Sequence, residues 1–137
     1  MGRILALDYG SKRVGLSISD DLKIIAQILE PNLSNDDKFF RNLLLIIKKY
    51  EIEKILVGHA RSMKGNDEKA GEITKKFAEE IRKKTSTDTE LVDERLSTVE
   101  AGHFLRQLGM KASIRKANID NQSAQIILQQ YLDSHRS

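Results

Sequence analysis

Acidic side chains stand at the ends of three predicted elements that are far apart in the sequence. Asp8 ends the first apolar run, Asp93 and Glu94 end the last predicted strand, and Asp120 begins the last amphipathic segment. Carboxylates that converge repel one another, which costs stability unless a cation lies between them. Mg²⁺ prefers oxygen ligands, and two such ions about 3.5 to 4 Å apart stabilise the attacking and leaving oxygens of a phosphoryl displacement. These residues therefore predict nuclease chemistry.

Each acid also has an ordinary structural explanation. Asp8 could make a turn, Asp120 could cap a helix, and Asp93 and Glu94 could pair with Arg95 at the surface. Their common placement at one edge of the predicted sheet favours the metal site. Side chains alternate along a strand, so Asp93 and Glu94 cannot both face one point without a twist, and we favour Glu94 as the ligand.

Basic side chains accompany the acids in the sequence. They lie beside the acids, in the loop after the fourth predicted strand, or between Glu100 and Asp120, where no acid occurs. An arginine side chain offers a fork of donors that matches a phosphate or a carboxylate. Solvated loops and helix ends are the alternative, because lysine and arginine are common there. The residues that we expect to contact a nucleic-acid backbone are Lys12, Arg13, Arg61, Lys64, Arg95, Arg115 and Lys116. Tyr9, beside Asp8, is the aromatic residue best placed to stack on a base.

The elements that must position these residues alternate in type along the chain. Apolar runs predict strands at 4–7, 14–18, 24–29, 54–57 and 90–93. Helical spacing and capping residues predict helices that open at 34–37 and near 66–67, at 97–108, and from residue 120 onward.

The order βββαβαβα predicts an α/β fold in three layers. Its mixed five-stranded sheet has three antiparallel strands followed by parallel αβ units, with helices covering both faces. Sites in such sheets lie at the carboxyl ends of the parallel strands. The acids converge there if the first, fourth and fifth strands are parallel neighbours.

Length and composition restrict the class of protein further. The 137 residues are expected to form one domain, 1–137, and 39% hydrophobic with 31% charged residues is ordinary globular usage. The longest aliphatic run is five residues, 43–47, against about 20 for a membrane span, so we expect no membrane association and a cytoplasmic protein. No cysteine is present, which excludes a thiolate metal site and a cysteine nucleophile.

Four segments, spread over essentially the whole chain, resemble the YqgF family, which is also called RuvX. They are LALDYGSKRVGLSISD (5–20), ILVGHARSMKG (55–65), VDERLST (92–98) and DNQSAQIILQQYLD (120–133), in the order of the family. The family has the ribonuclease H fold, is related to the Holliday-junction resolvase RuvC and is described as acting on pre-16S ribosomal RNA. The resemblance implies that Asp8, Glu94 and Asp120 are catalytic residues that bind Mg²⁺ or Mn²⁺, two ions in all. It also implies a structured nucleic acid as substrate, first of all the precursor of small-subunit ribosomal RNA.

The chain departs from the family pattern in two places. Gly58-His59-Ala60 stands where the family usually carries Gly-Leu-Pro, and Ser123-Ala124 stands where Ala-Ala is frequent. Loss of the proline leaves the loop after the fourth strand less restricted. His59 could move a proton near the metals, since imidazole titrates near neutrality, or it could be an ordinary loop histidine.

Other functions share parts of this pattern. A Holliday junction resolvase that cuts DNA needs two active sites and hence a dimer, and we expect a monomer or a weak homodimer. A non-catalytic RNA-binding module would keep the fold and the basic surface without turnover. ATPases of the actin and sugar-kinase group also begin with a D-x-G turn, but they close two lobes around ATP and 137 residues supply one.

Overall fold

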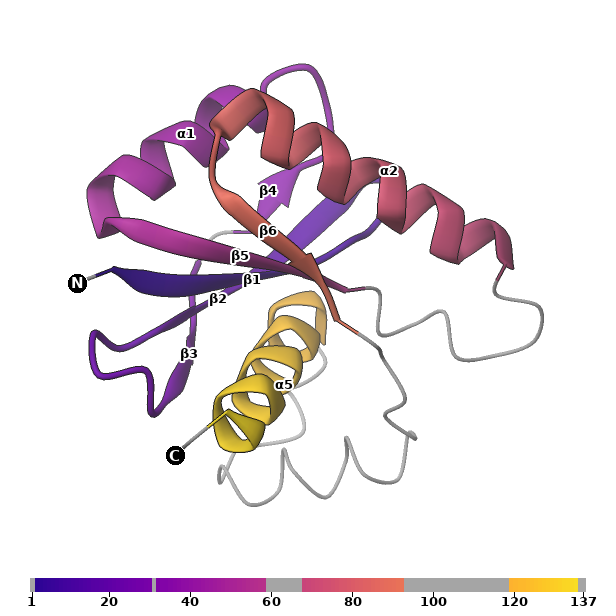
Figure 1. Ribbon diagram of the computed structural model, residues 1–137. Helices are drawn as coiled ribbons and strands as arrows, with labels where there is room; N and C mark the ends of the chain where they lie inside the picture. The colour runs from indigo at the N-terminus through magenta and orange to yellow at the C-terminus, as the bar shows by residue number, and fades with distance from the viewer. Residues whose placement is uncertain (1, 31, 59–67, 93–118, 136–137) are drawn as a thin grey trace.

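The computed structural model describes residues 2–30, 32–58, 68–92 and 119–135, with the backbone alone for 68–70 and 119–122 (Figure 1). The described strands and helices, in chain order, are β1 (Arg3–Asp8), β2 (Arg13–Ser19), β3 (Ala26–Ile28), β4 (Leu33–Ser34), α1 (Phe39–Tyr50), β5 (Ile52–Gly58), α2 (Glu68–Thr85), β6 (Asp88–Leu91) and α5 (Ile119–Ser134). None of these helices is long and apolar enough to cross a membrane.

The sheet is mixed, as predicted. Its strand order is β3-β2-β1-β5-β6, and the two-residue strand β4, which the sequence did not predict, pairs with β2 outside this path. β1 pairs antiparallel with β2 and parallel with β5, and β5 pairs parallel with β6. The first, fourth and fifth predicted strands are therefore parallel neighbours, and their carboxyl ends share one edge (Figure 1).

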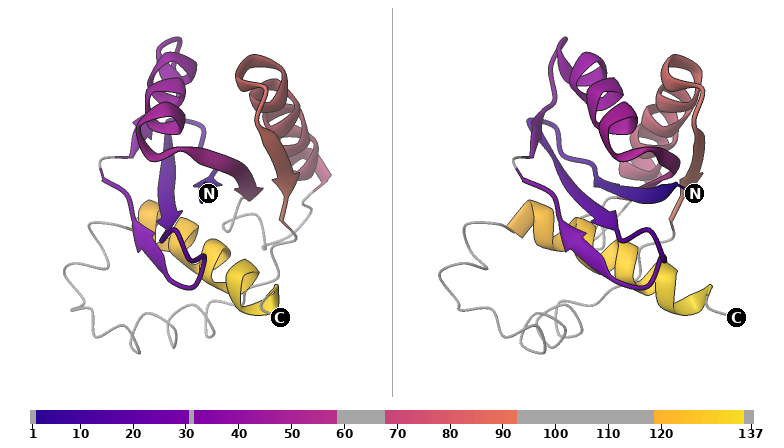
Figure 2. Two further views of the ribbon diagram at one scale, coloured as in Figure 1. Left: turned by 60° about the vertical axis from the view of Figure 1, so that its left-hand side comes forward. Right: turned by 90° about the vertical axis from the view of Figure 1, so that its left-hand side faces the viewer.

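Helices cover both faces of the sheet and make three layers (Figure 2). Side chains alternate along β1, so Leu5 and Leu7 pack in the core under α1 and α2, while Ile4 and Ala6 pack in the core under α5. This burial on both faces explains why the first strand reads as a continuous apolar run. The predicted stripe of the last helix is confirmed, since its described members are buried or half-buried: Ala124, Ile127, Leu128, Tyr131 and Leu132.

The first helix begins later than predicted. Residues 34–37 were expected to open it, but Ser34 belongs to β4, and α1 starts at Phe39 without a side-chain cap. Asn35 makes its hydrogen bonds to the turn between β1 and β2. Asp36 still accepts a local hydrogen bond from the Lys38 N–H at 3.0 Å, while the Asn35 side chain makes a tertiary contact.

The apolar stripes of α1 and α2 also differ from the predictions. Helical spacing in the sequence assigns Leu44 to the apolar stripe of the first helix and Ile73 to that of the second, yet these side chains are 44% and 48% exposed. On α2 the buried row begins at Thr74 and continues at spacings of three and four residues through Phe77, Ala78 and Ile81; on α1 Phe39 is buried. The predicted helix 97–108 and the predicted strand end at residue 93 lie outside the described residues.

Candidate active site

Asp8 lies at the carboxyl end of β1, which is the central strand of the sheet and the first of its three parallel strands. Its register partners are Gly15 on β2 and Gly58 on β5. The ladder continues past it, because Tyr9 N–H donates to the Gly58 carbonyl at 2.7 Å. One strand further, Val92 N–H donates to the Val57 carbonyl at 2.9 Å, so β6 ends at the same level of the sheet.

The surroundings of Asp8 suit a bound cation. Asp8 is only 3% exposed, and a buried carboxylate is costly to ionise unless positive charge or hydrogen bonds compensate it. Directly paired residues have Cβ atoms about 4.5 to 5.5 Å apart, but both partners of Asp8 are glycines and carry no side chain. The two directly paired positions therefore place no side chain beside the carboxylate, and an oxygen donor of this kind fits Mg²⁺ or Mn²⁺.

Asp8 also lies on the face of the sheet that α5 covers. It shares this face of β1 with Ile4 and Ala6, which pack against α5. The carboxyl-terminal half of α5, at Leu132, reaches Ile4 at the start of β1, so the helix runs back along β1 and begins toward the Asp8 end (Figure 1). Asp120 lies in the first turn of this helix, where the structure describes the backbone only.

A tight turn connects Asp8 to the basic residues that follow it. Lys12 and Arg13 are exposed, as a contact with substrate requires. A Cβ on Gly10 would lie 2.3 Å from the carbonyl oxygen of Arg13, so no other residue fits without moving the turn. The backbone of the β1–β2 turn is thus closely packed beside Asp8.

Tyr9 does not take the position that base stacking requires. Its side chain is half-buried and packs edge-on against Phe77 of α2, with ring centroids 4.7 Å apart. Because neighbouring residues of a strand point to opposite faces, Tyr9 lies on the α2 side when Asp8 lies on the α5 side. The prediction that Tyr9 stacks on substrate is therefore not supported.

The other predicted site residues lie outside the described residues. These are His59, Arg61, Lys64, Asp93, Glu94, Arg95, Arg115 and Lys116. Within the part of the chain that the structure describes, no three His, Cys, Asp or Glu side chains gather closely enough to hold a metal ion. Of the three predicted metal-binding acids, only Asp8 has a described side chain.

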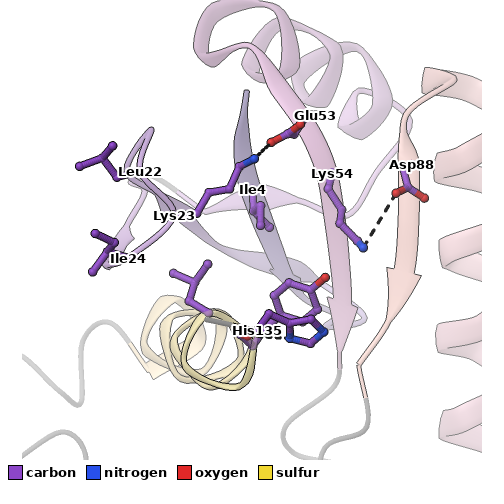
Figure 3. Close-up of a pocket in the computed structure, with 10 residues that line it drawn as sticks. Ile4, Leu22, Lys23, Ile24, Glu53, Lys54, Asp88 and His135 are labelled. Carbon is purple, nitrogen blue, oxygen red and sulfur yellow. Dashed lines mark hydrogen bonds and ion pairs between the residues drawn. The ribbon is translucent and has the colours of Figure 1, made fainter. Parts of the chain in front are cut away.

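A separate pocket of about 610 Å³ lies at the opposite, amino edge of the parallel strands (Figure 3). Two ion pairs join residues that line it, Lys23 with Glu53 and Lys54 with Asp88, the latter at 3.9 Å. Hydrogen bonding to Tyr131, and then to Glu90, raises the pKa of Lys54. The sequence analysis assigned no role to the residues that line this pocket: Ile4, Leu22, Lys23, Ile24, Glu53, Lys54, Asp88, Tyr131, Leu132 and His135.

Comparison with known proteins agrees with this architecture. The chain has the RuvC-like α/β fold: it superposes on the Thermus thermophilus RuvC structure with a TM-score of 0.60, covering 96% of this chain and 95% of that one at 12% identity. It belongs to the RuvX family, whose model, described as Holliday junction resolvase, matches residues 2–134.

Curated relatives cover almost the whole chain. A Chloroflexus aurantiacus protein is 36% identical over 135 residues, which is 98% of this chain and 88% of the relative. A Dictyoglomus turgidum protein is 38% identical over 133 residues, 96% of this chain and 94% of the relative. Each carries the name "Putative pre-16S rRNA nuclease".

Proposed function

We propose that this chain is a metal-dependent endonuclease that hydrolyses phosphodiester bonds in structured nucleic acid, with the precursor of 16S ribosomal RNA as its substrate. The substrate follows the name of the curated relatives. The observation that carries the proposal is the position of Asp8, buried at the carboxyl edge of parallel strands between Gly15 and Gly58. In this proposal residues 1–137 form a single nuclease domain. The protein acts in the cytoplasm.

In this proposal Asp8, Glu94 and Asp120 hold two divalent ions, Mg²⁺ or Mn²⁺. Asp120 belongs to the same i, i+4, i+7 row of α5 as Ala124 and Ile127, and both of these are buried against the sheet. That row faces the side of the sheet on which Asp8 lies, which supports Asp120 as the second acid.

We propose Glu94 and not Asp93 as the third acid, as the alternation in the sequence predicts. The last described residue before it, Val92, packs against the core under α5, on the side where Asp8 lies. Covalent geometry keeps the Cα of Glu94 within about 7.6 Å of that of Val92, whose N–H is bonded to the strand next to β1.

The protein's own groups supply position and charge for the reaction. When bound, the metal ions lower the pKa of a water nucleophile and neutralise charge on the phosphate. Asp8 is fixed on a central strand, so the acid does not need to reorganise. Hydrolysis breaks the bond to the 3′ oxygen and leaves a 5′ phosphate. Around this centre the backbone of the substrate contacts Lys12, Arg13, Arg61, Lys64, Arg95, Arg115 and Lys116.

A second candidate substrate is a four-way DNA junction, which the description of the family model favours. Symmetric cleavage of two strands needs two active sites, so this function requires a dimer. We propose a monomer or a weak homodimer. A mass measured by light scattering that stays at one chain at high concentration counts against the resolvase.

The decisive experiment is cleavage of end-labelled pre-16S RNA and of a four-way DNA junction, with Mg²⁺ and with Mn²⁺. Wild type is compared with Asp8→Asn and with Asp21→Asn, a matched change of an exposed acid in the turn after β2. We expect cleavage that requires metal, that Asp8→Asn abolishes and that Asp21→Asn preserves. Cleavage that Asp8→Asn leaves intact refutes the site. Tight binding of both nucleic acids without cleavage supports a non-catalytic binding module in place of the enzyme.

A further inference from the structure

Asn35 connects the segment before α1 to the turn between β1 and β2. Its side-chain Nδ2 donates a hydrogen bond to the Gly10 carbonyl at 2.8 Å. Its backbone N–H donates to the Lys12 carbonyl, also at 2.8 Å. One half-buried residue therefore binds the turn at two points, immediately before Arg13.

The turn needs such support more than Asp8 does. Asp8 is held by ladders on both sides, through its pairing with Gly15 and Gly58. Arg13 is the first residue of β2 and pairs with Ser34 of β4, whereas residues 10–12 lie outside all of these ladders, and glycine, present at position 10, has more backbone freedom than any other residue type. The bonds from Asn35 restrict that freedom at the place where the two exposed basic residues begin.

We propose that Asn35 is a positioning residue for substrate binding: it holds the β1–β2 turn so that Lys12 and Arg13 meet the phosphate backbone beside Asp8. This inference rests on the proposed nuclease function. Asn35 is expected to affect the affinity for nucleic acid and not the chemical step, because the pairing of β1 with its neighbours fixes Asp8 without Asn35.

The two bonds of Asn35 can be separated by mutation. The bond from its backbone to Lys12 survives any substitution except proline, whereas the bond to Gly10 needs a side-chain N–H. Asn35→Ala removes that donor. Asn35→Asp keeps the shape and replaces the donor by an acceptor, which cannot bond to a carbonyl. Asn42→Ala on α1 is the matched control, since it removes the same amide elsewhere.

The first measurement is the dissociation constant for labelled pre-16S RNA in the Asp8→Asn background, where cleavage does not interfere. We expect Asn35→Ala to raise it about tenfold, equivalent to about 1.4 kcal/mol, and Asn35→Asp to raise it further because its added negative charge also repels the phosphates. Asn42→Ala should leave it unchanged. In the cleaving protein, Asn35→Ala should raise KM and change kcat by less than about twofold. A fall in kcat at constant KM overturns the assignment to binding.

A double-mutant cycle distinguishes positioning from a general structural role. With Lys12→Ala and Arg13→Ala already present, Asn35→Ala should have no further effect on RNA affinity, because the groups that it positions are gone. An unchanged tenfold effect in that background overturns the proposal. Amide hydrogen exchange of residues 10–13 should accelerate in Asn35→Ala and Asn35→Asp, and unchanged protection in both also overturns it.

Failure of this inference and failure of the proposed function give different results. If wild type binds and cleaves RNA while the Asn35 variants match it, only the role of Asn35 is wrong. If wild type neither binds nor cleaves nucleic acid, the proposed function falls and the role of Asn35 falls with it. Circular dichroism of each variant identifies one that does not fold, and the isosteric Asn35→Asp then carries the test.

Discussion

Metal binding at Asp8 predicts a large, specific rise in thermal stability with Mg²⁺. A ligand that binds only the folded state adds about 2.7 kcal/mol to the free energy of unfolding at 100 times its dissociation constant. Unfolding entropy is about 2.1 cal/mol/K per residue, or about 0.29 kcal/mol/K for 137 residues. The expected shift in Tm is therefore about 9 °C for one ion, and larger for two.

The assay is differential scanning calorimetry over a Mg²⁺ titration, with EDTA as the metal-free reference. Asp8→Asn should lose most of the shift, because it removes a charged oxygen ligand from a site that is 3% exposed. The exposed Asp21→Asn should keep the shift, which separates a specific site from general screening of acids. Either a wild type that is insensitive to saturating Mg²⁺, or an Asp8→Asn variant with the full shift, refutes the metal site.

Further predictions follow from individual contacts. Gly15→Ala adds a methyl group at the position paired with Asp8. We expect at least a tenfold fall in the rate of cleavage, with little change in the Tm measured without metal. Normal cleavage would show that metal and substrate do not need this position to be free of a side chain. Lys12→Ala should weaken RNA binding and reduce the slope of log affinity against log salt by about 1, whereas an unchanged slope excludes a phosphate contact. The hydrogen bond from the Ile25 N–H, together with weaker effects of other contacts, lowers the pKa of Asp20 below its usual value of 3.8. The stability from this shift is therefore present above pH 3.8 and is lost as pH falls through the folded-state pKa. Asp20→Asn should remove that loss of stability at acid pH. The loss is expected to be less than about 1 kcal/mol because the carboxylate is largely solvated. Urea unfolding at pH 7 and at acid pH measures the free energy of unfolding of both proteins.

The sheet was predictable because its evidence is local. The run at 4–7 is apolar at every position since Leu5 and Leu7 face one layer of helices and Ile4 and Ala6 face the other. The end of the same run put Asp8 at the carboxyl end of the first strand, whereas the pairing of the first, fourth and fifth strands was only a condition for convergence until the structure showed it. Burial on both faces leaves a strong pattern in a single stretch of sequence.

The beginning of α1 was not predictable in the same way. A run of Ser, Asn and two Asp residues is typical of a helix N-terminus, and the prediction rested on that composition. In the structure the amide of Asn35 bonds to Gly10, 25 residues earlier in the chain. A contact over that separation leaves no local signature, so the residue that we now assign to positioning looked like a cap.

The glycines beside Asp8 show what the sequence could not predict about the candidate site. In the sequence alone, Gly15 is a small residue within a predicted strand, and Gly58 is the residue that ends another. Their role depends on register, because a shift of two residues in either pairing would keep every apolar side chain on its face and put Leu56 or Ser17 opposite Asp8. Either side chain would then stand at the position directly paired with the carboxylate, where the observed register has a glycine. The register therefore selects the chemistry, and it becomes visible only when both ladders are known.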